Sequence, residues 1–200
     1  MKNIVIVTLP RSGSTYFASQ KAKQYKLNFF NDEMEPFTGY KFAPNKLAHN
    51  IEQFEKYNKH GHFFITKIFV DDYINVLGLH GVDLIDLLEP YTQKFYVLVR
   101  KNIQENYNSL VTSFQNGQFE HDRRPTMVKQ PTSSLKTNFV PLNYVGLSHI
   151  YKNIIPSTKS ELVFYEDFAT VKDRYPNVGT CPEGWPTYKI GYKWVESLFL

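Results

Sequence analysis

The residues best suited to chemistry stand together near the start of the chain, where positions 9–15 read Leu-Pro-Arg-Ser-Gly-Ser-Thr. A continuous apolar and β-branched run, Ile4 to Thr8, precedes them and predicts a strand buried in a parallel sheet. A helical pattern follows, from Ser14 to about Tyr25. A helix N-terminus offers unpaired N–H groups and the positive end of the helix dipole, and both favour a bound anion. The stretch therefore predicts a phosphate-binding loop.

The side chains of this loop each have a use if a phosphate binds there. Gly13 lets the backbone approach an anion without interference from a Cβ atom. Ser12, Ser14 and Thr15 offer hydroxyl donors, and Arg11 offers a planar guanidinium of permanent charge. The alternative is an ordinary turn between strand and helix, in which Ser14 caps the helix and no ligand binds.

The loop differs from the usual nucleotide-binding pattern, G-x-x-x-x-G-K-[ST]. No glycine stands five residues before Gly13, and Ser14 occupies the place of the lysine. The stretch resembles instead the 5′-phosphosulfate loop of the sulfotransferase family, whose members transfer a sulfuryl group from 3′-phosphoadenosine 5′-phosphosulfate. Cytosolic members typically carry lysine where Arg11 stands, so the arginine is more similar to the carbohydrate and bacterial glycolipid sulfotransferases.

Another basic segment resembles the family's site for the nucleotide 3′-phosphate. An apolar strand at 95–99 ends in Arg100 and Lys101, and Ser109 follows on the next predicted helix. The family has a basic residue at the strand end and a serine eight positions later. Lys101 has that spacing, whereas Arg100 is one residue further from the serine. The sequence leaves open which of the two would hold the phosphate.

Two more segments resemble the family in the same order along the chain. Phe64-Ile65-Thr66-Lys67 is similar to the strand whose lysine touches the transferring sulfuryl group. Burying an ammonium without a partner costs several kcal/mol, which favours a functional role for Lys67. Residues 162–168 are similar to a late strand and its Tyr-Glu-Asp ending. There we expect Glu166 and Asp167 to be structural, with Asp167 capping a short helix.

The resemblance implies in-line transfer of a sulfuryl group to a hydroxyl acceptor, a carbohydrate or a glycolipid, with adenosine 3′,5′-bisphosphate as the other product. Arg11 and Lys67 would stabilise the charge that develops around the reacting group. A general base would take the proton of the acceptor. The scheme needs no metal, and the sequence shows no ligand cluster for one.

The general base cannot stand where cytosolic members have it, two residues after the strand lysine. Phe69 fills that position, and a phenyl ring cannot accept a proton. Carbohydrate-type members use a carboxylate after the first helix, a region that contains Asp32, Glu33 and Glu35 here. Glu35, which Phe37 follows closely, is most similar to that arrangement and is the expected base.

Strands and helices alternate along the chain, which predicts a single α/β domain over residues 1–200, with a central, mainly parallel sheet flanked by helices. Between Gly117 and Pro141 the periodicity disappears, which predicts a long loop or lid. Beyond the first strand and helix, the pattern predicts strands at 63–70, 95–99 and 161–165, and helices at 45–59, 82–88, 103–114, 143–155, 167–173 and 188–200.

The composition of the chain limits which classes of protein it can belong to. A hydrophobic content of 42% in 200 residues is enough for one buried core and excludes a disordered chain. Cys181 is the only cysteine, so an intrachain disulfide and a cysteine-based zinc site are excluded. A net charge of +4 suits a small anionic ligand, whereas a nucleic-acid binder usually has a denser basic stripe. No signal peptide or membrane-length apolar run is present, so we expect a cytoplasmic protein.

Two other functions fit part of the sequence. The first is a P-loop-type kinase or hydrolase, which would bind Mg²⁺ with carboxylates. Asp71 and Asp72, after the second predicted strand, could supply them, although the lysine of the nucleotide-binding pattern is missing from the loop. A non-catalytic module would bind a nucleotide or an anionic polymer through basic residues of the long loop, namely Arg123, Arg124, Lys129 and Lys136.

Overall fold

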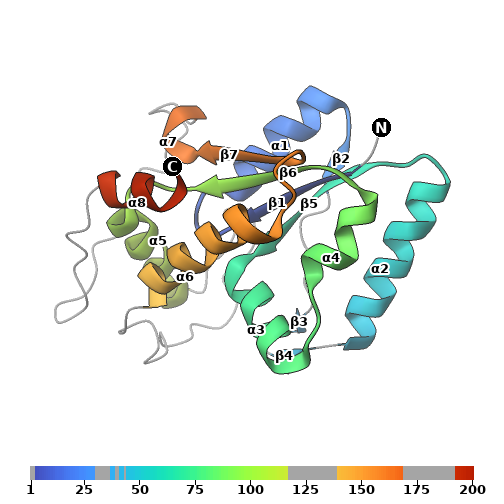
Figure 1. Cartoon of the computed structure of the whole chain (residues 1–200), viewed down its shortest axis with the longest axis horizontal. Coiled ribbons are helices and arrows are strands. Elements are labelled where there is room, and N and C mark those ends of the chain that lie inside the picture. The colour runs from blue at the N-terminus through green and yellow to red at the C-terminus, as the bar shows by residue number, and fades with distance from the viewer. Residues whose placement is uncertain (1–2, 30–36, 39–40, 43, 117–138, 169–191) are drawn as a thin grey trace.

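The computed structural model describes residues 3–29, 37–38, 41–42, 44–116, 139–168 and 192–200 (Figure 1). Within these residues the centre of the molecule is a five-stranded sheet in the order β2-β5-β1-β6-β7, and every neighbouring pair is parallel. A small antiparallel hairpin pairs β3 with β4. The strands are β1 (Asn3–Thr8), β2 (Asn28–Phe29), β3 (Phe37–Thr38), β4 (Lys41–Phe42), β5 (Phe64–Phe69), β6 (Thr92–Val99) and β7 (Ser160–Phe164).

Helices cover both faces of the sheet, so the expected α/β architecture with a parallel central sheet is confirmed (Figure 1). A 3-10 turn (Glu89–Tyr91) follows α4, and a π-helical turn (Ile150–Ile154) follows α6. The helices are α1 (Ser14–Tyr25), α2 (Pro44–Lys59), α3 (Val70–His80), α4 (Leu84–Leu88), α5 (Ile103–Asn116), α6 (Phe139–His149), α7 (Tyr165–Phe168) and α8 (Tyr192–Phe199).

β1 is the central strand, and its two faces belong to two different cores. Successive side chains of a strand point to opposite faces. Ile4 and Ile6 pack with residues of α1, whereas Val5 and Val7 pack with residues of α3 to α6 and α8. Because both faces are covered, β1 is continuously apolar from Ile4 to Val7 instead of alternating apolar with polar residues.

The strand order brings the segments that hold the candidate site residues to one edge of the sheet. β5 lies on one side of β1 and β6 on the other, so the chain reverses its direction of winding at β1. The carboxyl ends of parallel strands meet at the same edge, and the crevice at such a reversal is where open α/β sheets bind ligands. The loop after β1, the end of β5 and the turn after β6 therefore adjoin one another.

Most elements expected from the pattern are present with shifted ends, and a few are not as expected. α3 and the short strands β2, β3 and β4 were not predicted. α6 begins at Phe139, so the last three residues of the expected loop at 117–141 are helical. Asp167 lies inside α7 and does not cap it.

Residues 117–138 and 169–191 lie outside the described part of the chain. No described helix is long and apolar enough to cross a membrane.

Candidate functional site

The loop between β1 and α1 is a tight turn followed by a glycine. The Ser12 N–H donates to the Leu9 carbonyl (3.3 Å), with Pro10 second in the turn and Arg11 third. Arg11 has φ 64°, so the turn has the features of type II, in which the third residue is left-handed. An arginine in that conformation costs about 1–2 kcal/mol relative to a right-handed one. Such strain is found where a functional backbone is held by its surroundings.

Gly13, and not Ser14, is the N-cap residue of α1, and no described side chain caps this end of the helix. Ser14 is the first helical residue and, like Ser12, is buried. The interpretation in which Ser14 caps the helix is therefore wrong. The first N–H groups of α1 therefore have no side-chain cap among the described residues, which is what a phosphate-binding loop needs.

Gly13 is required for two structural reasons. Its φ of 78° is unfavourable for any residue with a side chain. A Cβ atom at this position would also overlap the Tyr165 ring, with Cδ2 only 2.5 Å away. The expected approach of an anion to Gly13 stays a prediction, and the structure adds that the missing side chain leaves room for this ring.

Lys67 lies beside the start of α1. It is 9% exposed, and its Nζ donates to Thr15 Oγ1 at 3.2 Å. The ammonium also lies 5.2 Å from the centre of the Phe69 ring. In the sheet register Lys67 faces Ile6 of β1, which brings it next to the helix that β1 leads into. Two residues proposed from separate segments of the sequence are thus in direct contact.

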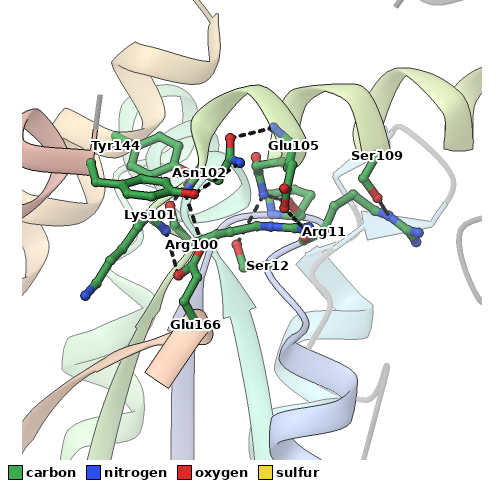
Figure 2. Close-up of polar contacts among 12 residues, drawn as sticks. Arg11, Ser12, Arg100, Lys101, Asn102, Glu105, Ser109, Tyr144 and Glu166 are labelled. Carbon is green, nitrogen blue, oxygen red and sulfur yellow. Dashed lines mark hydrogen bonds and ion pairs between the residues drawn. The ribbon is translucent and has the colours of Figure 1, made fainter. Parts of the chain in front are cut away.

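Arg11 reaches across the site to α5. Its Nε donates to Ser109 Oγ at 3.0 Å, although the two residues are 98 positions apart in the chain (Figure 2). Asn106, one turn earlier on α5 and 2% exposed, donates through Nδ2 to the Pro10 carbonyl at 3.0 Å. The loop is therefore attached to α5 by both a side chain and a backbone carbonyl.

Arg100 lies against the loop between β1 and α1. It is 7% exposed, and its Nη2 binds Glu105 Oε2 at 2.7 Å while Nη1 lies 3.4 Å from the Arg11 carbonyl oxygen. Its guanidinium carbon is 5.0 Å from the centre of the Tyr165 ring. The same ring therefore packs on Gly13 and on Arg100.

Lys101 extends away from Arg11 and Ser12 (Figure 2). Its Nζ lies 3.4 Å from Asp167 Oδ1 and 3.2 Å from Glu196 Oε1, on α7 and α8. Burial lowers the pKa of this ammonium, but the hydrogen bonds and charges of the two carboxylates outweigh burial and raise the pKa above its ordinary value. Of the two adjacent cations, Arg100 is the one beside the loop.

Sequence reasoning gave no role at this site to Glu105, Asn106 or Tyr165. One signal was available, because Asn102 and Glu105 have the spacing of a helix capping box. Asn102 Oδ1 does accept from the Glu105 N–H at 3.1 Å, at the start of α5. Nothing in the sequence indicates that Asn106 binds the loop or that Tyr165 covers Gly13.

The expected base, Glu35, lies outside the described residues, as do Asp32 and Glu33. The basic residues of the long loop are likewise outside. Among the residues that the structure does describe, no three histidine, cysteine, aspartate or glutamate side chains gather as a metal site would require.

Comparison with known proteins adds little to this geometry. No family model and no curated protein matches the chain. A solved structure of a sugar kinase from Janibacter sp. HTCC2649, without ligand, matches with a TM-score of 0.48 and 12% identity, over 83% of this chain and 86% of that chain. We draw nothing about activity from a similarity of this size.

Proposed function

We propose that this chain is a transferase that holds a phosphorylated adenosine nucleotide at residues 10–15 and transfers a sulfuryl group from 3′-phosphoadenosine 5′-phosphosulfate to a hydroxyl acceptor. The observation that carries the proposal is the contact between Lys67 and Thr15. It places a basic side chain beside the N-terminus of α1, where an anionic group would bind.

The same contact favours sulfuryl transfer over a P-loop-type kinase. In a nucleotide P-loop the lysine belongs to the loop, and the serine or threonine hydroxyl that follows binds Mg²⁺. Here the cation at the Thr15 hydroxyl is the ammonium of Lys67, which comes from β5. An ammonium 3.2 Å from that oxygen repels a magnesium ion from it. A positively charged side chain thus stands where a kinase would place its metal.

In the proposed reaction the acceptor oxygen attacks sulfur, and the bond between sulfur and the oxygen of the 5′-phosphate breaks. Lys67 and Arg11 stabilise the negative charge that moves onto that phosphate. A general base, proposed to be Glu35, takes the acceptor proton. The products are a sulfate ester and adenosine 3′,5′-bisphosphate. In this assignment Arg100 and Ser109 bind the 3′-phosphate, because both lie beside the loop.

The decisive experiment is incubation of the protein with labelled donor and a panel of glycans, glycolipids and small alcohols. Transfer of label to an acceptor supports the proposal. Binding of adenosine 3′,5′-bisphosphate should also raise the melting temperature more than AMP does, because a ligand that binds only the folded state stabilises it. Equal shifts from both nucleotides contradict the 3′-phosphate site. Turnover of magnesium ATP with no transfer of sulfuryl label would establish the kinase alternative instead.

A further inference from the structure

The neighbours Arg100 and Lys101 leave the end of β6 in different directions, and the backbone between them explains why. The Arg100 side chain binds Glu105 and the Arg11 carbonyl. The Lys101 side chain pairs instead with Asp167 and Glu196. The peptide group that joins them has a hydrogen bond at each end. The carbonyl belongs to Arg100 and the N–H to Lys101.

Glu166 binds the N–H end of this peptide. Its carboxylate accepts from the Lys101 N–H at 2.9 Å and from the Asn102 N–H at 3.1 Å, one oxygen for each donor (Figure 2). Hydrogen bonds from backbone N–H groups to a carboxylate are stronger than neutral ones. The carboxylate reaches the turn because Phe164, two residues earlier, pairs with Val99 at the end of β6.

Tyr144 binds the carbonyl end. Its hydroxyl, on α6, donates to the Arg100 carbonyl oxygen at 2.7 Å, and the residue is fully buried. Burial raises the pKa of this hydroxyl, the charge of Glu166 raises it further, and the charge of Arg100 opposes them. The hydroxyl therefore keeps its proton and remains a donor throughout the physiological range.

We propose that Glu166 and Tyr144 are positioning residues that clamp the peptide between Arg100 and Lys101 and so keep the Arg100 guanidinium at the phosphate loop. Turning this peptide would break the bonds at both ends. It would also redirect the two side chains. The inference rests on the proposed function, since it assigns Arg100 to the second phosphate of the nucleotide. Neither positioning residue touches the ligand in this scheme.

The test compares affinities for adenosine 3′,5′-bisphosphate and AMP in wild type and in Glu166→Gln. The glutamine oxygen accepts one N–H, but its NH₂ group cannot accept the second. We expect the preference for the bisphosphate to fall about tenfold, the scale of a lost hydrogen bond to a charged group, with AMP affinity unchanged. Tyr144→Phe keeps the buried ring and should lower the same preference. Asp167→Asn, on the same short helix, is the matched control and should leave it unchanged.

The outcomes separate the two proposals. If wild type shows no preference for the bisphosphate, the 3′-phosphate site is absent, and the proposed function fails together with this inference. If wild type shows the preference and both Glu166→Gln and Tyr144→Phe retain it, the positioning roles are overturned while the proposed function stands. An equal loss of affinity for both nucleotides would also overturn them, because it would indicate a general loss of structure.

Discussion

The ammonium nitrogen of Lys67 lies 3.2 Å from the hydroxyl oxygen of Thr15, across 52 positions of the chain. One residue is on the strand beside β1, and the other is in the first turn of the helix that β1 leads into. The contact exists because β5 and β1 are parallel neighbours, which brings the end of one strand to the loop after the other. It places a nearly buried cation at the N-terminus of α1.

Lys67→Ala should lower turnover by roughly a hundredfold or more, the scale of a lost transition-state donor. Nucleotide affinity should change little, because the ammonium is proposed to contact mainly the transferring group. Steady-state kinetics and a binding titration measure the two effects separately. Lys94→Ala is the control, since Lys94 is a partly exposed lysine paired with Glu161 on the next strand. Near-normal turnover in Lys67→Ala would assign that residue a purely structural role.

Variants of Arg11 should separate the effect of the backbone angle on stability from the effect of the side chain on activity. Because φ is 64° at this position, Arg11→Gly should be about 1 kcal/mol more stable than Arg11→Ala, which keeps the strained conformation. Both variants should lose turnover roughly a hundredfold. Arg11→Lys should keep partial activity, because the charge remains while the guanidinium fork is lost. Urea unfolding and turnover assays test this, and a glycine variant less stable than the alanine variant would contradict it.

Gly13→Ala should destabilise the fold by about 1–3 kcal/mol, since the new methyl group meets the Tyr165 ring at a backbone angle unfavourable for alanine. Part of this cost should disappear in a Tyr165→Ala background, where only the backbone strain remains. A double-mutant cycle on the free energy of unfolding measures the coupling. Purely additive effects would show that the ring does not restrict position 13.

Glu35→Gln should leave nucleotide binding intact and lower turnover by about 10²–10⁴, the usual range for general acid–base catalysis. Glu33→Gln and Asp32→Asn are the neighbouring controls and should be milder. If Glu33→Gln abolishes turnover and Glu35→Gln does not, the base is Glu33.

The ion pairs of Lys101 predict a loss of stability at alkaline pH. The pKa of Lys101 is higher in the folded chain than in the unfolded chain. Its pairs therefore stabilise the fold fully below the ordinary lysine pKa of about 10.4, and that stabilisation is lost as the pH rises through the folded value. The free-energy difference between wild type and Lys101→Met, measured by urea unfolding, should shrink above about pH 10.4. A constant difference would contradict the raised pKa.

The sequence by itself determined the parallel α/β architecture, because continuous apolar runs and helical periodicity are local properties of the chain. The strand–turn–helix that contains residues 9–15 was equally local, since a buried strand, a turn with proline and glycine, and a helix follow one another directly. Short elements escaped prediction. β2 has only two residues and forms because it pairs with β5, so no local sequence pattern predicts it.

Only the tertiary structure decided which of the proposed residues meet. Spacing to Ser109 favours Lys101 for the 3′-phosphate site, whereas the fold places Arg100 beside the loop. The reason is that a side chain's direction at a strand end depends on the peptide that follows it. Here the partners of that peptide come from elements 44 and 65 positions away, which spacing along the chain cannot reveal.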